Sequence, residues 1–242
     1  MNKIVDAASI ILTYEDEIFL IERQHYLKAF PGYISFPGGK IEPEDAAIAK
    51  RYAVPFGNKA IDEKILGGAI REGVEELGID LGLMMENGEV VGIDHLGVAI
   101  TPDFNPYRFA THFLRFKLTR RPEMTVDTNE ARVSFWLKAN LIKQKFEAGE
   151  FLAVPPIRKT CIDLGANINL KTIENLNVTY DSESEVPYIE PLQGMMQIMP
   201  LSHTLRPATR TNAFLIGDVC KVLVDPSPLS IEEYEKLKNT VL

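Results

Sequence analysis

The stretch 71-REGVEELGID-80 places three carboxylates, those of Glu72, Glu75 and Glu76, within five positions of the chain. An α-helix turns by about 100° per residue, so Glu75 and Glu76 lie about −60° and +40° from Glu72. The three side chains therefore share one face about 100° wide. Like charges at this spacing repel each other by roughly 0.2–0.5 kcal/mol per pair. The cluster therefore needs either free access to water or a cation.

A helix over about residues 63–77 is expected to carry this face. Asp62 precedes it as a good N-cap residue, and Gly78 follows it at the position where a left-handed conformation commonly ends a helix. The apolar residues expected on the side away from the carboxylates are Ile70, Val74 and Leu77.

Three features favour a cation over a simply solvated acidic face. Gly67, Gly68 and Gly73 lie within the same helix, although each glycine costs up to about 1 kcal/mol relative to Ala, which indicates close approach of another backbone or of a ligand. Arg71 can pair with a carboxylate and hold it, and 36-FPGG-39 leaves backbone groups open. Clustered carboxylates provide the oxygen ligands that Mg²⁺ and Mn²⁺ prefer.

These residues resemble the box of the Nudix hydrolase superfamily: Gly, five residues, Glu, seven residues, then Arg-Glu-aliphatic-x-Glu-Glu-x-Gly-aliphatic. Here Gly39 begins the box, Asp45 stands in place of the first Glu, and residues 71–79 close it with Gly73 in place of the first aliphatic residue. Residues 46–70 number 25 where the usual spacing is seven, so this spacer contains an insertion of 18 residues. Such an interruption is similar to the branch that contains the peroxisomal coenzyme A diphosphatase.

The resemblance implies an α/β Nudix fold, an α/β/α sandwich with a mixed sheet, plus a short C-terminal β appendage. It also implies Mg²⁺ or Mn²⁺ as the cofactor. The metal ligands it implies are Glu72, Glu75 and Glu76, with Glu130 as a further ligand or water activator from a later loop. Arg71 and Asp45 would orient the ligands. The catalytic residues expected are Glu76, Glu75, Glu130 and Arg71.

The chain upstream of the box resembles the coenzyme A signature of that branch. The stretch 19-FLIERQHYLKAFPGYISFPGGKIEPED-45 keeps the length of the signature, although Gln24 replaces its Ser. The residues expected to contact substrate are Arg23, Lys28, Gly38, Gly39, Arg108 and His112. The first interpretation is a pyrophosphohydrolase for coenzyme A or acyl-CoA. Two others stay open: hydrolysis of ADP-ribose or NADH, and a catalytically weak Nudix-fold binding module.

The charge and composition of the chain indicate which partners and which compartment to expect. The net charge of −8 leaves no basic surplus for a nucleic-acid backbone, although a small anion screened by a bound cation is compatible with it. The partner that the resemblance implies is a small nucleotide diphosphate. The longest apolar runs are too short for a membrane span, and the first residues lack the pattern of a signal peptide. Cys161 and Cys220, far apart, match no disulfide framework. A cytoplasmic protein with reduced thiols is expected.

Three parts are expected along the chain. Residues 1–175 form the Nudix domain, residues 176–197 are polar and form a linker or edge segment, and residues 198–242 resemble the first two strands of a metallo-β-lactamase fold. That fold holds zinc with a His-x-His-x-Asp-His motif, which these residues lack. The segment is either the start of a truncated longer fusion or a structural appendage, with a homodimer contact as one form of the latter. The core strands expected are 7–12, 18–21, 34–36, 90–100, 109–118 and 133–137. A helix at 141–148 and the segment 157–169 complete the expected mixed α/β core.

Overall fold

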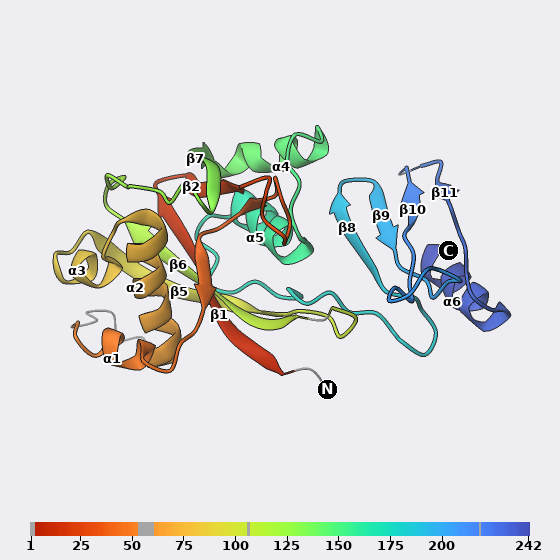
Figure 1. Ribbon diagram of the computed structural model, residues 1–242. Helices are drawn as coiled ribbons and strands as arrows, with labels where there is room; N and C mark the ends of the chain where they lie inside the picture. The colour runs from red at the N-terminus through yellow and green to blue at the C-terminus, as the bar shows by residue number, and fades with distance from the viewer. Residues whose placement is uncertain (1–2, 53–60, 106, 218) are drawn as a thin grey trace.

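The computed structural model of the chain describes residues 3–52, 61–105, 107–217 and 219–242. Within these ranges a mixed sheet has helices on both faces, and a smaller antiparallel sheet follows it near the C-terminus (Figure 1). The expected α/β fold with a mixed sheet and a C-terminal β appendage is therefore confirmed. Residues 53–60, part of the expected insertion at 46–70, lie outside the described residues.

In the larger sheet, the segment that contains Gly38 and Gly39 pairs with the first strand of the chain. Its described strands are β1 (Ile4–Tyr14), β2 (Glu17–Arg23), β3 (Ile34–Ser35), β4 (Gly38–Lys40), β5 (Val90–Ile100), β6 (Arg108–Leu118) and β7 (Ala131–Lys138). They follow the order β3-β2-β1-β6-β5, with β4 on β1 and β7 on β2. The predicted hairpin of β1 and β2 is present, but it pairs only near its turn, at Thr13↔Ile18 and Tyr14↔Glu17. Beyond Ile18 the same edge of β2 pairs with β3, at Ile21↔Ser35 and Glu22↔Ile34, and the edge of β1 that β2 has left pairs with β4.

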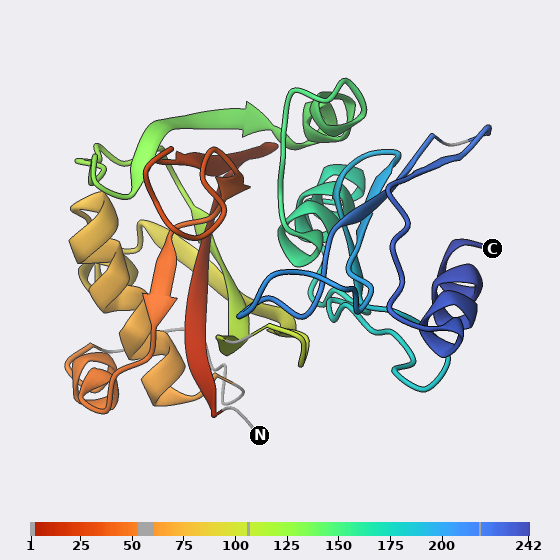
Figure 2. The ribbon, with the colours of Figure 1, turned by 45° about the vertical axis from the view of Figure 1, so that its right-hand side comes forward.

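Five described helices belong to this part of the chain. They are α1 (Asp45–Ala49), α2 (Glu63–Leu77), α3 (Leu81–Glu86), α4 (Ala139–Glu147) and α5 (Pro155–Ala166). Helix α2 lies on one face of the sheet, and α4 and α5 lie on the other (Figures 1 and 2). Helix α3 was not predicted. It forms because the Asp80 side chain caps it by accepting from Leu83 N at 3.0 Å, directly after the turn at Gly78.

Helix α2 begins and ends where the sequence predicts. Asp62 Oδ1 accepts a hydrogen bond from Lys64 N at 2.7 Å, and Gly78 has a φ of 67°. Ile70, Val74 and Leu77 lie on the side of the helix away from the carboxylates, as predicted; Ile70 and Leu77 are buried there, whereas Val74 is 49% exposed. Val74 lies about 200° from Glu72 around the helix, beyond the arc from about 60° to 160° that contains the buried Ala69, Leu77 and Ile70.

Each face of the large sheet has its own apolar core. The α2 side packs residues of α2 and α3 against Leu114 and Phe116 of β6. The opposite side packs α4 and α5, including Phe146 and Leu164, against Phe113. Strand β6 serves both cores because alternate residues of a strand point to opposite faces.

The C-terminal part contains more structure than expected. Its described strands are β8 (Tyr188–Leu192), β9 (Met195–Ile198), β10 (Ala213–Ile216) and β11 (Val222–Val224), and helix α6 (Ile231–Val241) packs on them. The segment expected as a linker therefore holds β8 and most of β9. The polar residues before β8 hid them, and β8 itself is only half-buried, with Glu190 and Pro191 interrupting its apolar residues.

The smaller sheet contacts α5 through its edge strand β8. Arg158 Nη2 lies 3.2 Å from Glu190 Oε2, and Ala153 N donates to Pro191 O at 3.4 Å. Cys161 is buried and Cys220 is exposed, and neither forms a disulfide. None of the described helices is both long and apolar enough to cross a membrane.

Candidate active site

Two glycines let the edge of the sheet approach the acidic helix. Strand β4 pairs with β1 at Ala8↔Gly39 and Ser9↔Gly38, directly beside α2. A Cβ atom at Gly39 would overlap the carboxyl group of Glu72, and one at Gly38, whose φ is 139°, would overlap Ala8 O. Gly38 N donates to Glu76 Oε2 at 2.9 Å. The glycines of the sequence motif thus bring backbone into direct contact with two of the three carboxylates.

Arg71 organises the other side of the cluster. Its Nη1 donates to Glu72 Oε1 at 2.8 Å and to Glu75 Oε2 at 2.9 Å, while its Nε donates to Asp45 Oδ1 at 2.9 Å. Its Nη2 donates to Lys40 O at 2.6 Å, which connects α2 to β4. The ion pair expected between Arg71 and a carboxylate is therefore present, and it involves three acidic residues at once.

Asp45 is fully buried at the start of α1 and supports this arginine. Helix α1 approaches α2 at Gly67 and Gly68, where a Cβ atom would overlap the backbone of Asp45 or come within 2.9 Å of its Oδ2. These two glycines thus serve the close backbone approach that the sequence indicated. Gly73 has a different role, because a Cβ there would come within 3.2 Å of Leu81, which fills the space of the usual aliphatic residue.

The three glutamates of the cluster occupy different environments. The Glu72 side chain is 11% exposed and that of Glu75 is 57% exposed, with Glu76 partly buried. Burial raises the pKa of Glu72, although Arg71 lowers it in part. Burial also raises the pKa of Glu76 to about 7; the Gly38 N–H opposes this shift, and the negative charges of Glu72 and Glu130 add to it. Negative charge is therefore least compensated at Glu76.

Glu130 reaches this position from the loop before β7. Asp127 N donates to Glu76 O at 2.8 Å, which attaches the start of that loop to the end of α2. Glu130 Oε2 lies 3.8 Å from Arg23 Nη2, and Arg23 lowers the pKa of Glu76 while Glu130 raises it. The fold thus brings Arg23 and Glu130, which the sequence separates widely, to the same end of α2.

A comparison with the sequence models of known protein families identifies the family of this chain. The sequence model described as the NUDIX domain matches residues 3–154, which is more than half of the chain. The chain belongs to the NUDIX family. The match spans the glycine strand, the acidic helix and the loop of Glu130. Together with the fold, it identifies the chain as a pyrophosphohydrolase.

A solved structure supports the NUDIX fold. The NUDIX hydrolase from Alicyclobacillus acidocaldarius is similar with 23% identity and a TM-score of 0.57, over 69% of this chain and 93% of that chain. The MutT protein from Methanosarcina mazei Go1 has 16% identity and a TM-score of 0.45, over 70% of this chain and 98% of that chain. No curated protein matches the chain significantly. The coenzyme A branch and the β-lactamase resemblance stay predictions.

NUDIX enzymes use divalent metals, and the donor chemistry of the site suits such an ion. Carboxylate oxygens are the ligands that Mg²⁺ and Mn²⁺ favour. Burial raises the pKa values of Glu72 and Glu76, so a cation beside them would stabilise their ionised form. Among the described residues, however, no three His, Cys, Asp or Glu side chains are arranged to hold one ion. The reason is that Arg71 already bonds Glu72 and Glu75.

The remaining residues predicted to bind substrate lie in three places. Lys28 is exposed on the loop that follows Arg23. Arg108 begins β6, where its Nε donates to Thr101 O at 3.0 Å. His112 is two strands from Gly39, since Ala8 of β1 pairs with both. Its Nδ1 lies 3.2 Å from His95 Nε2, and the two rings are stacked. Of these three residues, only Lys28 lies on the loop that directly follows Arg23, the residue near Glu130.

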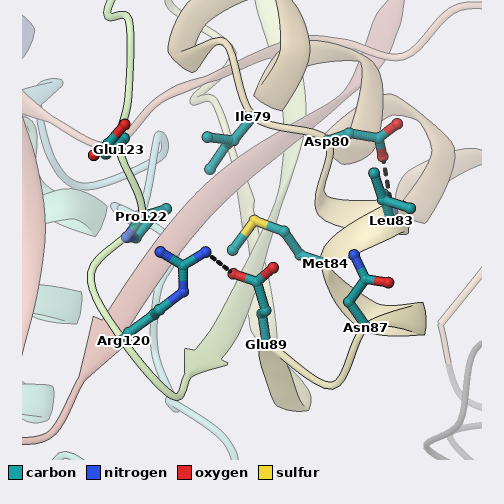
Figure 3. A pocket seen from close by; sticks show the side chains of 9 residues that line it. All are labelled: Ile79, Asp80, Leu83, Met84, Asn87, Glu89, Arg120, Pro122 and Glu123. Carbon is teal, nitrogen blue, oxygen red and sulfur yellow. Dashed lines mark hydrogen bonds and ion pairs between the residues drawn. The ribbon is translucent and has the colours of Figure 1, made fainter.

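A separate hollow of about 230 Å³ lies beside α3 (Figure 3). It is lined by Ile79, Asp80, Leu83, Met84, Asn87, Glu89, Arg120, Pro122 and Glu123. Arg120 Nη2 lies 2.6 Å from Glu89 Oε2, and Asp80 caps α3, so much of its charge is already paired. It contains none of the glutamates of the NUDIX box, and we do not assign the reaction to it.

Proposed function

We propose that the chain hydrolyses the diphosphate linkage of coenzyme A or acyl-CoA with Mg²⁺ or Mn²⁺. The observation that carries this proposal is the pair Glu72 and Glu76, two carboxylates held against the glycine strand β4 with excess negative charge. A divalent cation compensates such charge directly. The substrate class is supported by the coenzyme A signature over residues 19–45.

The proposed metal ligands are Glu72, Glu75, Glu76 and Glu130. The side chains of Glu75 and Glu130 are 57% and 39% exposed, so each has room to exchange its contact with Arg71 or Arg23 for a cation. Arg71 would hold Glu72 and Asp45 would hold Arg71, which keeps the buried part of the site in place. The bound ion would neutralise charge on the diphosphate and make an attacking water more acidic.

Residues of the chain are proposed to accept the proton of the attacking water and to bind the substrate. Water attacks one phosphorus, the bond from that phosphorus to the bridging oxygen breaks, and two phosphomonoesters leave. We assign the proton of the water to the carboxylate of Glu130, because the bonds of Arg71 go to other acidic residues. Arg23, at the end of β2, lies near Glu130, and we assign it to a phosphate oxygen of the substrate, with Lys28 on the loop that follows as a second contact. Arg108 and His112 are proposed for the rest of the substrate.

A substrate panel tests the proposal. Coenzyme A, ADP-ribose and NADH are incubated with the protein in Mg²⁺, in Mn²⁺ and in EDTA, and phosphomonoesters are quantified by chromatography. We expect metal-dependent turnover with the highest kcat/KM for coenzyme A. A preference for ADP-ribose or NADH would keep the reaction and reject the substrate. Absence of metal-dependent turnover of all three would favour a binding module.

A matched pair of variants locates the site. Glu76→Gln is expected to lose turnover by about 10²-fold or more, as for loss of a group that acts in the reaction. Glu147→Gln makes the same chemical change on the exposed surface of α4, where Glu147 pairs only with Lys143 at 3.5 Å. Full activity of Glu76→Gln would place the reaction elsewhere.

A further inference from the structure

The loop that carries Glu130 is held by its backbone carbonyl groups. Four consecutive carbonyl oxygens, those of Thr128, Asn129, Glu130 and Ala131, each accept a hydrogen bond from the segment that follows Arg23. Loops on a protein surface commonly leave such groups to water. Here one short segment of the chain binds all four.

Gln24 supplies most of these bonds. Its Nε2 donates to Thr128 O at 2.7 Å and to Ala131 O at 3.5 Å, and its backbone N donates to Glu130 O at 3.0 Å. An amide nitrogen has two N–H groups, so both are used on this one loop. Gln24 therefore binds the carbonyl group of Glu130 and carbonyl groups on both sides of it in the sequence.

Tyr26 completes the set although its ring is 65% exposed. Its hydroxyl donates to Asn129 O at 2.9 Å. The other end of the loop is held at the helix, where Asp127 N donates to Glu76 O at 2.8 Å. The backbone of Glu130 is thus fixed between the end of α2 and the segment 24–26, and its side chain can face Glu76 only as long as both attachments hold.

We propose that Gln24 and Tyr26 are positioning residues that hold Glu130 at the acidic site. This inference rests on the proposed role of Glu130, through which both residues would act. Neither side chain has to touch the substrate for this role. Gln24 stands where the coenzyme A signature has Ser, a side chain that is too short to span the same carbonyl groups, so the device belongs to this chain.

Steady-state kinetics on coenzyme A test the inference. Gln24→Met keeps the length of the side chain and removes both donors, and Tyr26→Phe removes only the hydroxyl. We expect kcat to fall by about 10–100-fold in Gln24→Met, with a smaller loss in Tyr26→Phe and little change in KM, as for loss of a partner that orients a metal ligand. The matched controls are Gln144→Met on the exposed face of α4 and Tyr234→Phe on α6.

A double-mutant cycle separates positioning from general destabilisation. If Gln24 acts through Glu130, adding Gln24→Met to Glu130→Gln changes kcat by less than about 2-fold, because the two losses are not additive. Equal losses in both backgrounds would overturn the inference and assign Gln24 a structural role. Full activity of Glu130→Gln would reject the role of Glu130 in the proposed function, and the catalytic part of the inference with it.

Hydrogen exchange provides a readout that needs no turnover. Peptides that cover residues 127–131 are expected to exchange faster in Gln24→Met than in the wild type or in Gln144→Met. Unchanged exchange would overturn the positioning of the loop and leave the proposed function untouched. The two failures are therefore distinguishable.

Discussion

Replacement of Glu76 by Gln is expected to stabilise the metal-free protein while it removes activity. The pKa of Glu76 is raised from 4.5 to about 7, mainly by burial. A folded-state pKa above the unfolded value means that the folded protein binds this proton more tightly, so the carboxylate favours folding below about pH 4.5 and opposes it increasingly as the pH rises through about 7. Gln cannot ionise and removes this dependence.

The magnitude follows from the shift. A difference of about 2.5 pH units corresponds to roughly 3 kcal/mol at pH 8, because each unit is about 1.36 kcal/mol. The gain shrinks to below about 1 kcal/mol at pH 5, where the wild type is mostly protonated in the folded state. The Oε1 atom of Gln can still accept from Gly38 N, so this hydrogen bond is retained. For a chain of this length, 3 kcal/mol is an increase of about 6–12 °C in Tm.

Urea unfolding measures the effect. Trp136 is the single tryptophan, and its ring lies 5.4 Å from that of Phe19 on the neighbouring strand, so its fluorescence reports on the large sheet. Wild type, Glu76→Gln and the surface control Glu147→Gln are compared at pH 5 and pH 8 in EDTA. Added Mg²⁺ is expected to stabilise the wild type and not Glu76→Gln, because an ion that binds the folded state raises the free energy of unfolding.

Two outcomes would refute this reasoning. If Glu76→Gln is no more stable than the wild type at pH 8 in EDTA, the ionised carboxylate of Glu76 does not destabilise the folded state as its burial implies. If its stability gain is the same at pH 5 and pH 8, the gain comes from packing and not from ionisation. A gain in Glu147→Gln of equal size would point to the net charge of the protein.

Three further predictions concern the same site. Gly39→Ala is expected to displace the Glu72 carboxyl group, which a Cβ would overlap, and to lower kcat by at least about 10-fold in the coenzyme A assay while circular dichroism stays native. Asp45→Ala leaves Arg71 without its buried partner and is expected to cost about 3–5 kcal/mol in urea unfolding; a loss below 1 kcal/mol would show that the pair is not needed. EDTA is expected to abolish turnover and excess Mg²⁺ or Mn²⁺ to restore it, whereas activity that persists after dialysis against EDTA would reject the metal requirement.

Local patterns predicted the acidic helix well. The N-cap at Asp62 and the left-handed Gly78 depend on neighbouring residues only, so both ends of α2 were readable from the sequence. The predicted strand hairpin and the close approach at Gly67 and Gly68 were also correct. Helix periodicity alone, however, did not say which part of the helix circumference is buried: Val74, opposite the carboxylates, is 49% exposed, whereas Glu72 is buried.

Elements with weak local signals were missed. Helix α3 is six residues long and depends on a single side-chain cap, and strands β8 and β9 lie in a polar segment. These short elements form because tertiary partners cover them. Arg158 of α5, for example, contacts both the side chain and the backbone of Glu190 on β8.

The sequence by itself determined that three glutamates and an arginine share one helix and that a glycine segment faces them, because helix periodicity, caps and motif spacing act over a few residues; that this segment pairs as strand β4 came from the structure. The tertiary structure alone decided which glutamate is exposed, which has its pKa raised to about 7, and which segment holds the loop of Glu130. These properties depend on burial and on contacts between residues about a hundred positions apart, such as Gln24 and Thr128. No local pattern encodes such contacts.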